Sequence, residues 1–348
     1  MTGPRILLHL GTHKTGSTSI QQTLWRARSA NVGLPRGGKA NQSDLARLLF
    51  EEGDRLEQFR ITRMAGTDRA ALAKAREAAR DRLARDLARC RRSVFVFSAE
   101  DMTAPDFPEE ALHRAADFFR GFSDRVEAVA YVRAPLAFMT SAYLQRLREL
   151  KPTALDFAPE TLWPGYRDRF EKLDTVFGTG ATTLRAFDRA TLEGGDVVRD
   201  FLGLIDAGLA GRIRVLRSNE SLALPALALL YARLAVETGA KTDFTGDEAR
   251  SLCGLKARRL RPLAGPPLVI DAGVLDPVRE AHADDLAWME RRLGRTLPDA
   301  PIGEGLTEAR AMLPLARAAL PRVATLPANA RPGLSRRLWQ RLRRVARA

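Results

Sequence analysis

The chain has 348 residues, of which 45% are hydrophobic and 28% are charged, and its formal net charge is +14. These values are typical of a globular protein with one large domain or two modest ones. They exclude a disulfide-stapled fold, because the chain has two cysteines, and a membrane-spanning one, because no apolar run reaches roughly eighteen residues.

Targeting and metal-binding signals are not found in the sequence either. Residues 1–5 lead into an apolar run without the segments of a signal peptide, so we expect a cytoplasmic protein. The four histidines, His9, His13, His113 and His282, are scattered without ligand spacing. No acidic cluster resembles a calcium or magnesium loop. We therefore expect no metal.

Strand-like and helix-like segments alternate along most of the chain. β-Rich runs occupy residues 6–10, 93–97, 126–132 and 182–187, and helical patterns cover 17–25, 42–50, 70–90 and 195–202. This alternation predicts an α/β fold of three layers, in which helices flank a central parallel sheet.

The first predicted strand runs into a glycine-containing loop, GTHKTGSTSIQ at residues 11–21. A glycine-rich turn before a helix directs several backbone N–H groups toward one point, where the helix dipole also favours an anion. The loop therefore predicts a phosphate or sulfate ligand and makes the expected fold P-loop-like.

The position of the lysine argues against a nucleoside triphosphate as that ligand. A triphosphatase loop has Gly, four residues, and then Gly-Lys-Ser/Thr. Gly11 and Gly16 have this spacing, but Ser17 follows Gly16 and the lysine is at position 14, inside the loop. Lys14 would then lie beside the scissile end of the ligand.

With these residues, loop 11–21 closely resembles the 5'-phosphosulfate loop of sulfotransferases that use 3'-phosphoadenosine 5'-phosphosulfate (PAPS), particularly of the bacterial carbohydrate-type branch. A second segment, residues 126–145, resembles the 3'-phosphate motif of the same family. It has a predicted strand followed by Arg133, then Pro135 at the start of a helix and Ser141 eight residues after the arginine. An arginine at a strand end can fork onto a phosphate, and a serine two helical turns further along can donate its hydroxyl.

The resemblance implies that PAPS is the cosubstrate and that its sulfuryl group is transferred in line. Lys14, a candidate catalytic residue, and the loop N–H groups would stabilise charge on the bridging oxygen. Thr15, Ser17 and Thr18 would hold the 5'-phosphate. The expected PAPS-binding residues are Gly11, His13, Lys14, Thr15, Gly16, Ser17, Thr18, Arg133 and Ser141.

The base that deprotonates the acceptor is predicted from the position of acidic residues relative to the predicted strands and helices. Glu100 follows the β-rich run 93–97, and open α/β sheets place their chemistry at the carboxyl ends of strands. Glu100 is therefore the first candidate, although capping of the next helix or binding of the acceptor would also explain it. Asp44 is the second candidate, because related enzymes present an acid or histidine after the first helix.

The resemblance covers about residues 5–235, and we expect residues 1–235 to form the PAPS-binding core. We expect residues 236–299 to form a helical C-terminal extension of the fold, an appendage that packs on that core. We expect residues 300–332 to be linker-like. The acceptor is expected to be a glycan, a lipid, a lipid-linked molecule or a small metabolite. Loops 33–44 and 105–110 are expected to build its pocket.

The C-terminal segment, residues 333–348, has the pattern of a basic amphipathic helix. Residues 331–348 hold seven arginines and no acid, and leucines, Trp339 and Val345 fall on the opposite side. Such a helix binds anionic membrane surfaces, so a peripheral contact with the inner membrane face is one expectation. A solvated tail and a helix docked on the domain are the others.

Two other functions compete with sulfuryl transfer. An ATP- or GTP-dependent kinase or hydrolase would use the same strand, loop and helix, with Asp101 as a magnesium-binding acid. A non-catalytic basic protein that binds a membrane surface would explain the tail but neither phosphate motif. We expect no nucleic acid partner, because basic and aromatic residues are not interleaved.

Overall fold

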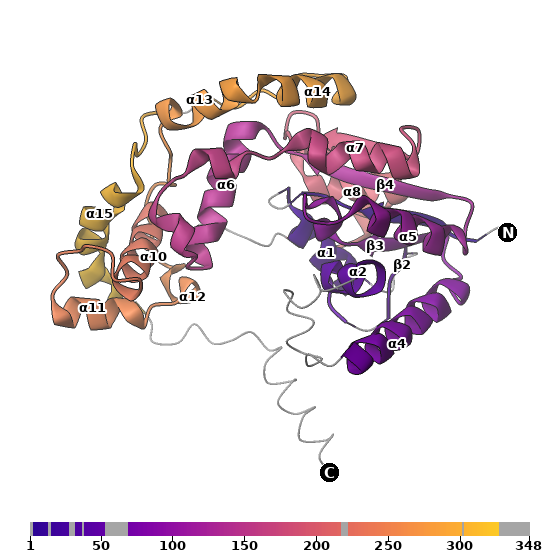
Figure 1. Ribbon diagram of the computed structural model, residues 1–348, viewed down its shortest axis with the longest axis horizontal. Helices are drawn as coiled ribbons and strands as arrows, with labels where there is room; N and C mark the ends of the chain where they lie inside the picture. The colour runs from indigo at the N-terminus through magenta and orange to yellow at the C-terminus, as the bar shows by residue number, and fades with distance from the viewer. Residues whose placement is uncertain are drawn as a thin grey trace, which may run out of the picture. The chain divides into compact units, whose positions relative to one another are not determined.

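The computed structural model describes residues 3–12, 15–27, 32–36, 38–52, 69–216, 222–300 and 303–326. It contains a five-stranded sheet in the order β2-β3-β1-β4-β5, and every neighbouring pair is parallel (Figure 1). The strands are β1 Arg5–His9, β2 Val32–Gly33, β3 Val94–Ser98, β4 Val126–Val132 and β5 Thr182–Ala186. The central parallel sheet that the sequence predicts is confirmed.

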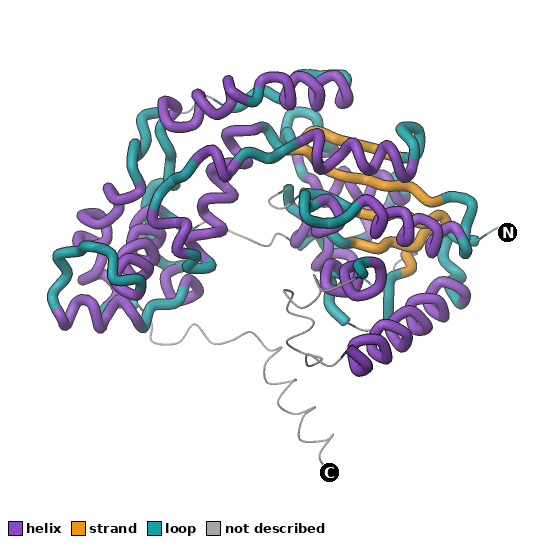
Figure 2. Tube along the Cα trace, viewed as in Figure 1, coloured by secondary structure: helices purple, strands orange, loops and turns teal. Residues whose placement is uncertain are grey.

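Helices account for most of the other described residues (Figure 2). They are α1 Ser17–Arg26, α2 Ser43–Phe50, α4 Arg69–Ala88, α5 Glu109–Arg120, α6 Pro135–Arg148, α7 Tyr166–Phe177, α8 Val197–Ile205, α9 Leu209–Arg212, α10 Leu224–Glu237, α11 Gly246–Cys253, α12 Ala257–Leu260, α13 Ala272–Ala281, α14 Ala283–Leu293 and α15 Met312–Ala319. Short 3-10 helices are η2 Glu100–Thr103, η3 Pro152–Leu155, η4 Pro159–Leu162, η5 Glu193–Gly195, η6 Ala309–Ala311 and η7 Leu320–Val323.

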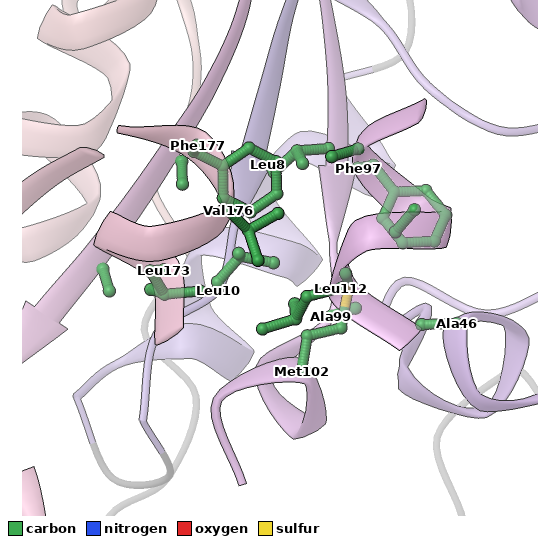
Figure 3. Packing of buried hydrophobic residues seen from close by; sticks show 14 of the residues in the cluster. Leu8, Leu10, Ala46, Phe97, Ala99, Met102, Leu112, Leu173, Val176 and Phe177 are labelled. Atoms are coloured by element: carbon green, nitrogen blue, oxygen red, sulfur yellow. The ribbon is translucent and has the colours of Figure 1, made fainter. Parts of the chain in front are cut away.

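Side chains of opposite parity on each strand cover the two faces of the sheet, as the period of a strand requires. On one face Leu8 of β1 and Leu10, just after it, pack with Phe97 of β3 and with apolar residues of α2, α5, α7 and η2. Figure 3 shows residues of this cluster, including Ala46 of α2 and Leu173 of α7. α2 and the η2 turn are therefore fixed to the same apolar cluster as the ends of β1 and β3.

The other face of the sheet is covered by α1, α8 and α9. Leu7 of β1 and Val96 of β3 pack with Ile20 and Leu24 of α1 and with Phe201 of α8. The helices on both faces give the three-layer arrangement that the alternating pattern predicts. His9 and Ser98 continue the residue parity of this second face to the carboxyl ends of β1 and β3.

The chain divides into two compact units whose limits differ from the expected domains. One comprises Met1–Ala142, Leu162–Asn219 and Leu275–Pro301, and the other comprises Tyr143–Thr161, Glu220–Val274 and Ile302–Ala348. All described site residues lie in the first unit. A functional division of the chain at residues 235 and 299 stays a prediction.

The structure differs from the expected linker at residues 300–332. Residues 309–323 form η6, α15 and η7, and α15 packs against α10 within the second unit. Met312 and Ala316 are fully buried there, so this helix is held by an apolar face that the sequence analysis missed. The basic segment 333–348 lies outside the described residues. None of the described helices is both long and apolar enough to cross a membrane.

Candidate anion and acceptor site

The anion loop, which we define as residues 11–18, joins β1 to α1, and its glycines are required by its geometry. Gly16 precedes α1 with φ 80°, a left-handed conformation that favours glycine. A Cβ atom on Gly16 would stand 2.5 Å from Val197 Cγ1 of α8 and 3.5 Å from Phe187 Cε2. His13 and Lys14 lie outside the described residues.

The hydroxyl groups of the loop face inward and shape it. Thr15 and Ser17 are buried, and both hydroxyls donate to the Thr12 carbonyl oxygen, at 2.8 Å and 3.3 Å. The Thr12 hydroxyl in turn donates to the Tyr131 carbonyl at the end of β4. The Ser19 N–H donates to the Gly16 carbonyl at 2.9 Å. The N–H groups of Ser17 and Thr18, at the very start of α1, have no acceptor within the helix and point toward the place of an anion. Thr18 is half-buried in that turn.

The second motif is built at the end of β4, next to the first. Arg133 follows β4 directly, its carbonyl accepts the Tyr166 hydroxyl at 2.6 Å, and its guanidinium carbon lies 5.7 Å from the centroid of the Phe187 ring. Phe187 follows β5 and is fixed there because its N–H donates to the Val132 carbonyl at 2.6 Å. The same ring is the one that approaches Gly16, so a single aromatic side chain contacts both motifs.

The guanidinium of Arg133 is held in a partly desolvated position. Burial lowers its pKa from the ordinary value, and the Asp299 carboxylate opposes that shift. Asp299 also accepts the Ala137 N–H in the first turn of α6, at 3.2 Å. Ser141 lies further along α6 and is half-buried.

Glu100 opens the η2 turn at the end of β3 and is held by residues from the start of α2. The Asn41 amide donates to Glu100 Oε1 at 2.9 Å, and the Ser43 hydroxyl accepts the Asp101 N–H at 3.1 Å. Ala99 N–H donates to the His9 carbonyl at 3.0 Å, so Glu100 is attached beside the end of β1, where the anion loop begins.

The neighbouring Asp101 belongs to a structural ion-pair cluster. Arg47 of α2, whose side chain is 5% exposed, pairs with Asp101 at 3.1 Å, with Glu51 at 2.6 Å and with Asp106 at 3.3 Å. A buried guanidinium needs such partners, because losing one would leave a desolvated charge. The cluster ties the η2 turn to α2 and engages the carboxylate of Asp101.

Asp44, the second candidate base, lies on the rim of a pocket. It pairs with Lys39 at 2.7 Å, and both side chains are about half exposed. The pocket has a volume of about 330 Å³ and lies between loop 35–44, α2 and α4, with Leu45, Leu48 and Leu83 among its lining residues. Asn41 lines it too, so the residue that holds Glu100 also borders this pocket.

The structure therefore brings most of the described candidates to one edge of the sheet. Gly16 and Arg133 both lie close to Phe187, and Gly11, Thr15 and Ser17 lie together in the same loop as Gly16. Glu100 lies beside the end of β1. The sequence analysis missed Phe187, Asn41 and Asp299. Phe187 had a usable signal, because an aromatic residue directly after a strand lies at the edge where the other strands also end.

No group of three or more metal-ligating side chains is found among the described residues. The candidate site is consequently one of backbone N–H groups, hydroxyls and guanidinium groups, which bind anions, together with one carboxylate at its border.

No family model matches the chain, and no curated protein matches it. Two solved structures resemble it in part. A sulfotransferase from Alicyclobacillus acidocaldarius is 14% identical, with a TM-score of 0.42 over 85% of this chain and 98% of the other. The sulfotransferase domain of the Synechococcus PCC 7002 olefin synthase is 16% identical, with a TM-score of 0.36 over 81% of this chain and 96% of that domain. Likenesses at this level do not indicate what the chain binds or transfers.

Proposed function

We propose that this protein is a sulfotransferase that moves the sulfuryl group of PAPS to a hydroxyl or amine of an acceptor. The observation that carries the proposal is the meeting of two phosphate-binding motifs at Phe187, which approaches Gly16 of the anion loop and stacks under Arg133. Two anion sites at neighbouring strand ends match one nucleotide with phosphates on both its 5' and 3' positions.

The residues present fit a bisphosphorylated nucleotide. The inward hydroxyls of Thr15 and Ser17 leave the backbone N–H groups of the loop for the 5'-phosphate. Arg133 is desolvated and stacked, which suits a guanidinium that binds a phosphate through two N–H groups. Ser141 would join Arg133 at the 3'-phosphate.

The reaction is a single displacement. The acceptor oxygen or nitrogen forms a bond to sulfur while the bond between sulfur and the bridging oxygen breaks, and adenosine 3',5'-bisphosphate leaves with that oxygen. Lys14 and the loop N–H groups stabilise the negative charge that this oxygen gains. Glu100 takes the proton of the acceptor, and Asn41 orients its carboxylate through the bond to Oε1.

We further propose that the pocket beside α2 holds the acceptor, because it shares Asn41 with the Glu100 turn. The acceptor would be a glycan, a lipid, a lipid-linked molecule or a small metabolite, in the cytoplasm. A lipid acceptor would give the basic segment 331–348 a role at the membrane face. Unchanged sedimentation with anionic liposomes after deletion of that segment would refute this role.

The kinase alternative loses support from the η2 turn. It requires an aspartate at a strand end that is available for magnesium, whereas the Asp101 carboxylate is engaged by the buried guanidinium of Arg47.

The test is a thermal-shift titration of adenosine 3',5'-bisphosphate against ATP with magnesium. A ligand at about 100 times its dissociation constant adds about 2.7 kcal/mol to the free energy of unfolding. We expect stabilisation by the bisphosphate, lost in Arg133→Ala but kept in Arg89→Ala, which removes an exposed arginine just after α4. Stabilisation by magnesium-ATP alone would favour the kinase.

A further inference from the structure

His9 is a buried polar residue at the last position of β1 that the chemistry described so far does not use. It is fully buried, and it pairs in register with Ser98 of β3. Its Nδ1 atom lies 2.7 Å from the Ser98 hydroxyl oxygen, while its Nε2 atom has no hydrogen-bond partner among the described residues. Buried polar atoms are almost always paired, so this nitrogen requires an explanation.

The neighbours of Ser98 determine which nitrogen of His9 carries the proton. The Ser98 hydroxyl oxygen accepts the Gln21 amide N–H at 3.2 Å. Among the described residues, His9 Nδ1 is the one recorded partner of the Ser98 hydroxyl that can accept its proton, which assigns the acceptor role to Nδ1. A neutral imidazole has one N–H group, so the proton of His9 is on Nε2.

The ring is neutral under ordinary conditions. Burial lowers the pKa of His9 to about 4, and the Glu100 carboxylate opposes the shift. At neutral pH the ring therefore accepts at Nδ1 and donates at Nε2. The Phe201 ring, whose centroid is 4.9 Å from that of His9, packs against it and limits its rotation.

The unpartnered Nε2 atom faces the anion loop. His9 Nε2, Thr15 Oγ1 and Ser17 Oγ each lie 3.2 Å from the point where a Cβ atom of Gly11 would stand. The two hydroxyls donate their protons to the Thr12 carbonyl, so their lone pairs remain as acceptors. One donor and two acceptors thus meet beside the Cα atom of Gly11, where the Cβ atom of any other residue would crowd all three.

We propose that His9 is a positioning residue of the anion loop, whose Nε2–H donates to an oxygen atom held between Gly11, Thr15 and Ser17. This oxygen belongs to the bound anion or to a water molecule that also bonds the two hydroxyls. Through the bond to Ser98, the same ring connects the loop to β3 and to Gln42, whose Oε1 accepts the Ser98 N–H at 2.7 Å. The inference rests on the proposed function only in its choice of adenosine 3',5'-bisphosphate as the probe.

Two substitutions separate the nitrogens of the ring. In His9→Gln the amide nitrogen can reach the place of Nε2, but the bond to Ser98 is lost. In His9→Asn a polar atom remains near the place of Nδ1, but the donor toward the loop is lost. We expect His9→Asn to weaken bisphosphate binding at least about tenfold by calorimetry and His9→Gln to stay within about threefold of the unchanged protein.

A larger loss of bisphosphate affinity in His9→Gln than in His9→Asn would overturn the proposal, because His9 would then act through its bond to Ser98. Unchanged affinity in both variants would also overturn it, because His9 would then have no role in binding. Thermal unfolding of each ligand-free variant shows whether it is folded. If both variants lose affinity, the binding data do not separate the two nitrogens, and the position of the proton on the His9 ring of the unchanged protein then tests the proposal.

The tautomer is measured by NMR of protein labelled with nitrogen-15 histidine, with the His9 signals identified by their loss in His9→Gln. We expect a proton on Nε2, and a proton on Nδ1 would overturn the proposal. If the Nε2–H signal of the free protein is already protected from exchange with solvent, the acceptor of this N–H is assigned to a water oxygen. One that shifts or appears with the bisphosphate identifies an oxygen of the anion. Failure of the wild-type protein to bind the bisphosphate contradicts the proposed function and leaves this ligand-free measurement to test His9.

Discussion

The anion loop and the turn that carries Glu100 lie at the ends of neighbouring strands but are held in different ways. The loop is shaped locally, by the φ of 80° at Gly16 and by two hydroxyls that donate to Thr12. The turn is held from a distance in sequence, by Asn41 and Arg47 of the α2 region. Because Asn41 also lines the pocket, the orientation of Glu100 depends on the segment that would contact an acceptor.

This difference separates the two halves of the proposed reaction. Binding of the sulfuryl donor depends on backbone geometry that few residue types allow. Deprotonation of the acceptor depends on a carboxylate whose position is set by side-chain contacts. Substitutions in the turn should therefore alter turnover while leaving nucleotide binding unchanged.

The sharpest test of this separation is Glu100→Gln. We expect turnover to fall about 10²- to 10⁴-fold, since general base catalysis contributes by that amount, with little change in affinity for adenosine 3',5'-bisphosphate. Steady-state kinetics and calorimetry measure the two quantities. Asp44→Asn is the matched control, and a larger loss of turnover there would transfer the role of base to Asp44.

On the donor side, Lys14→Ala should lower turnover about 10²- to 10³-fold, because it removes a cation that stabilises the leaving oxygen. The thermal midpoint should stay unchanged. The turnover of Lys14→Ala is compared with that of Lys39→Ala, which removes the same charge from a half-exposed lysine on the pocket rim. Full activity in Lys14→Ala would contradict the assignment.

The local shape of the loop is tested by two glycines with similar backbone conformations. Gly16 and Gly38 have φ of 80° and 85°, but a Cβ atom meets Val197 only at Gly16 and nothing within 4 Å at Gly38. Gly38→Ala should cost about 1–2 kcal/mol of unfolding free energy. Gly16→Ala should cost about 1–3 kcal/mol more because of overpacking.

Chemical denaturation measures both costs, and Val197→Ala should recover part of the loss in Gly16→Ala. Equal costs for the two glycine substitutions would mean that the contact with α8 does not constrain the loop.

The last expected effect is a pH dependence carried by His9. Its pKa is about 4 in the folded protein and about 6.5 in an unfolded chain, so between these values the unfolded state binds the extra proton. Stability should therefore fall as pH drops from about 6.5 to about 4, by about 1.4 kcal/mol per pH unit at most from this group. His9→Gln should lack this component in denaturation curves across that range. Parallel curves for the two proteins would contradict it.

The sequence predicts the loop better than the turn for a physical reason. The strands and Gly11, Gly16 and Arg133 can be recognised because strand periodicity and tight turns restrict residue types over short distances. Asn41, which bonds Glu100, and Ser43, which bonds Asp101, are about 60 positions away, and any polar residue there would have had the same local pattern.

The register of β1 and β3 limited the prediction of His9 in the same way. His9 becomes a neighbour of Ser98 only once the two strands are paired. Helix α15 was missed for a simpler reason, since its buried residues form a short apolar face between prolines.

The central claim is that the two motifs bind one nucleotide through both of its phosphates. Calorimetry of adenosine 3',5'-bisphosphate and adenosine 5'-phosphate, each with the unchanged protein and with Arg133→Ala, tests it most directly. We expect the unchanged protein to prefer the bisphosphate at least about tenfold, as a charge-assisted bond to Arg133 implies, and the variant to bind both ligands alike. A preference for the bisphosphate that survives in Arg133→Ala, or no preference in the unchanged protein, would contradict the claim.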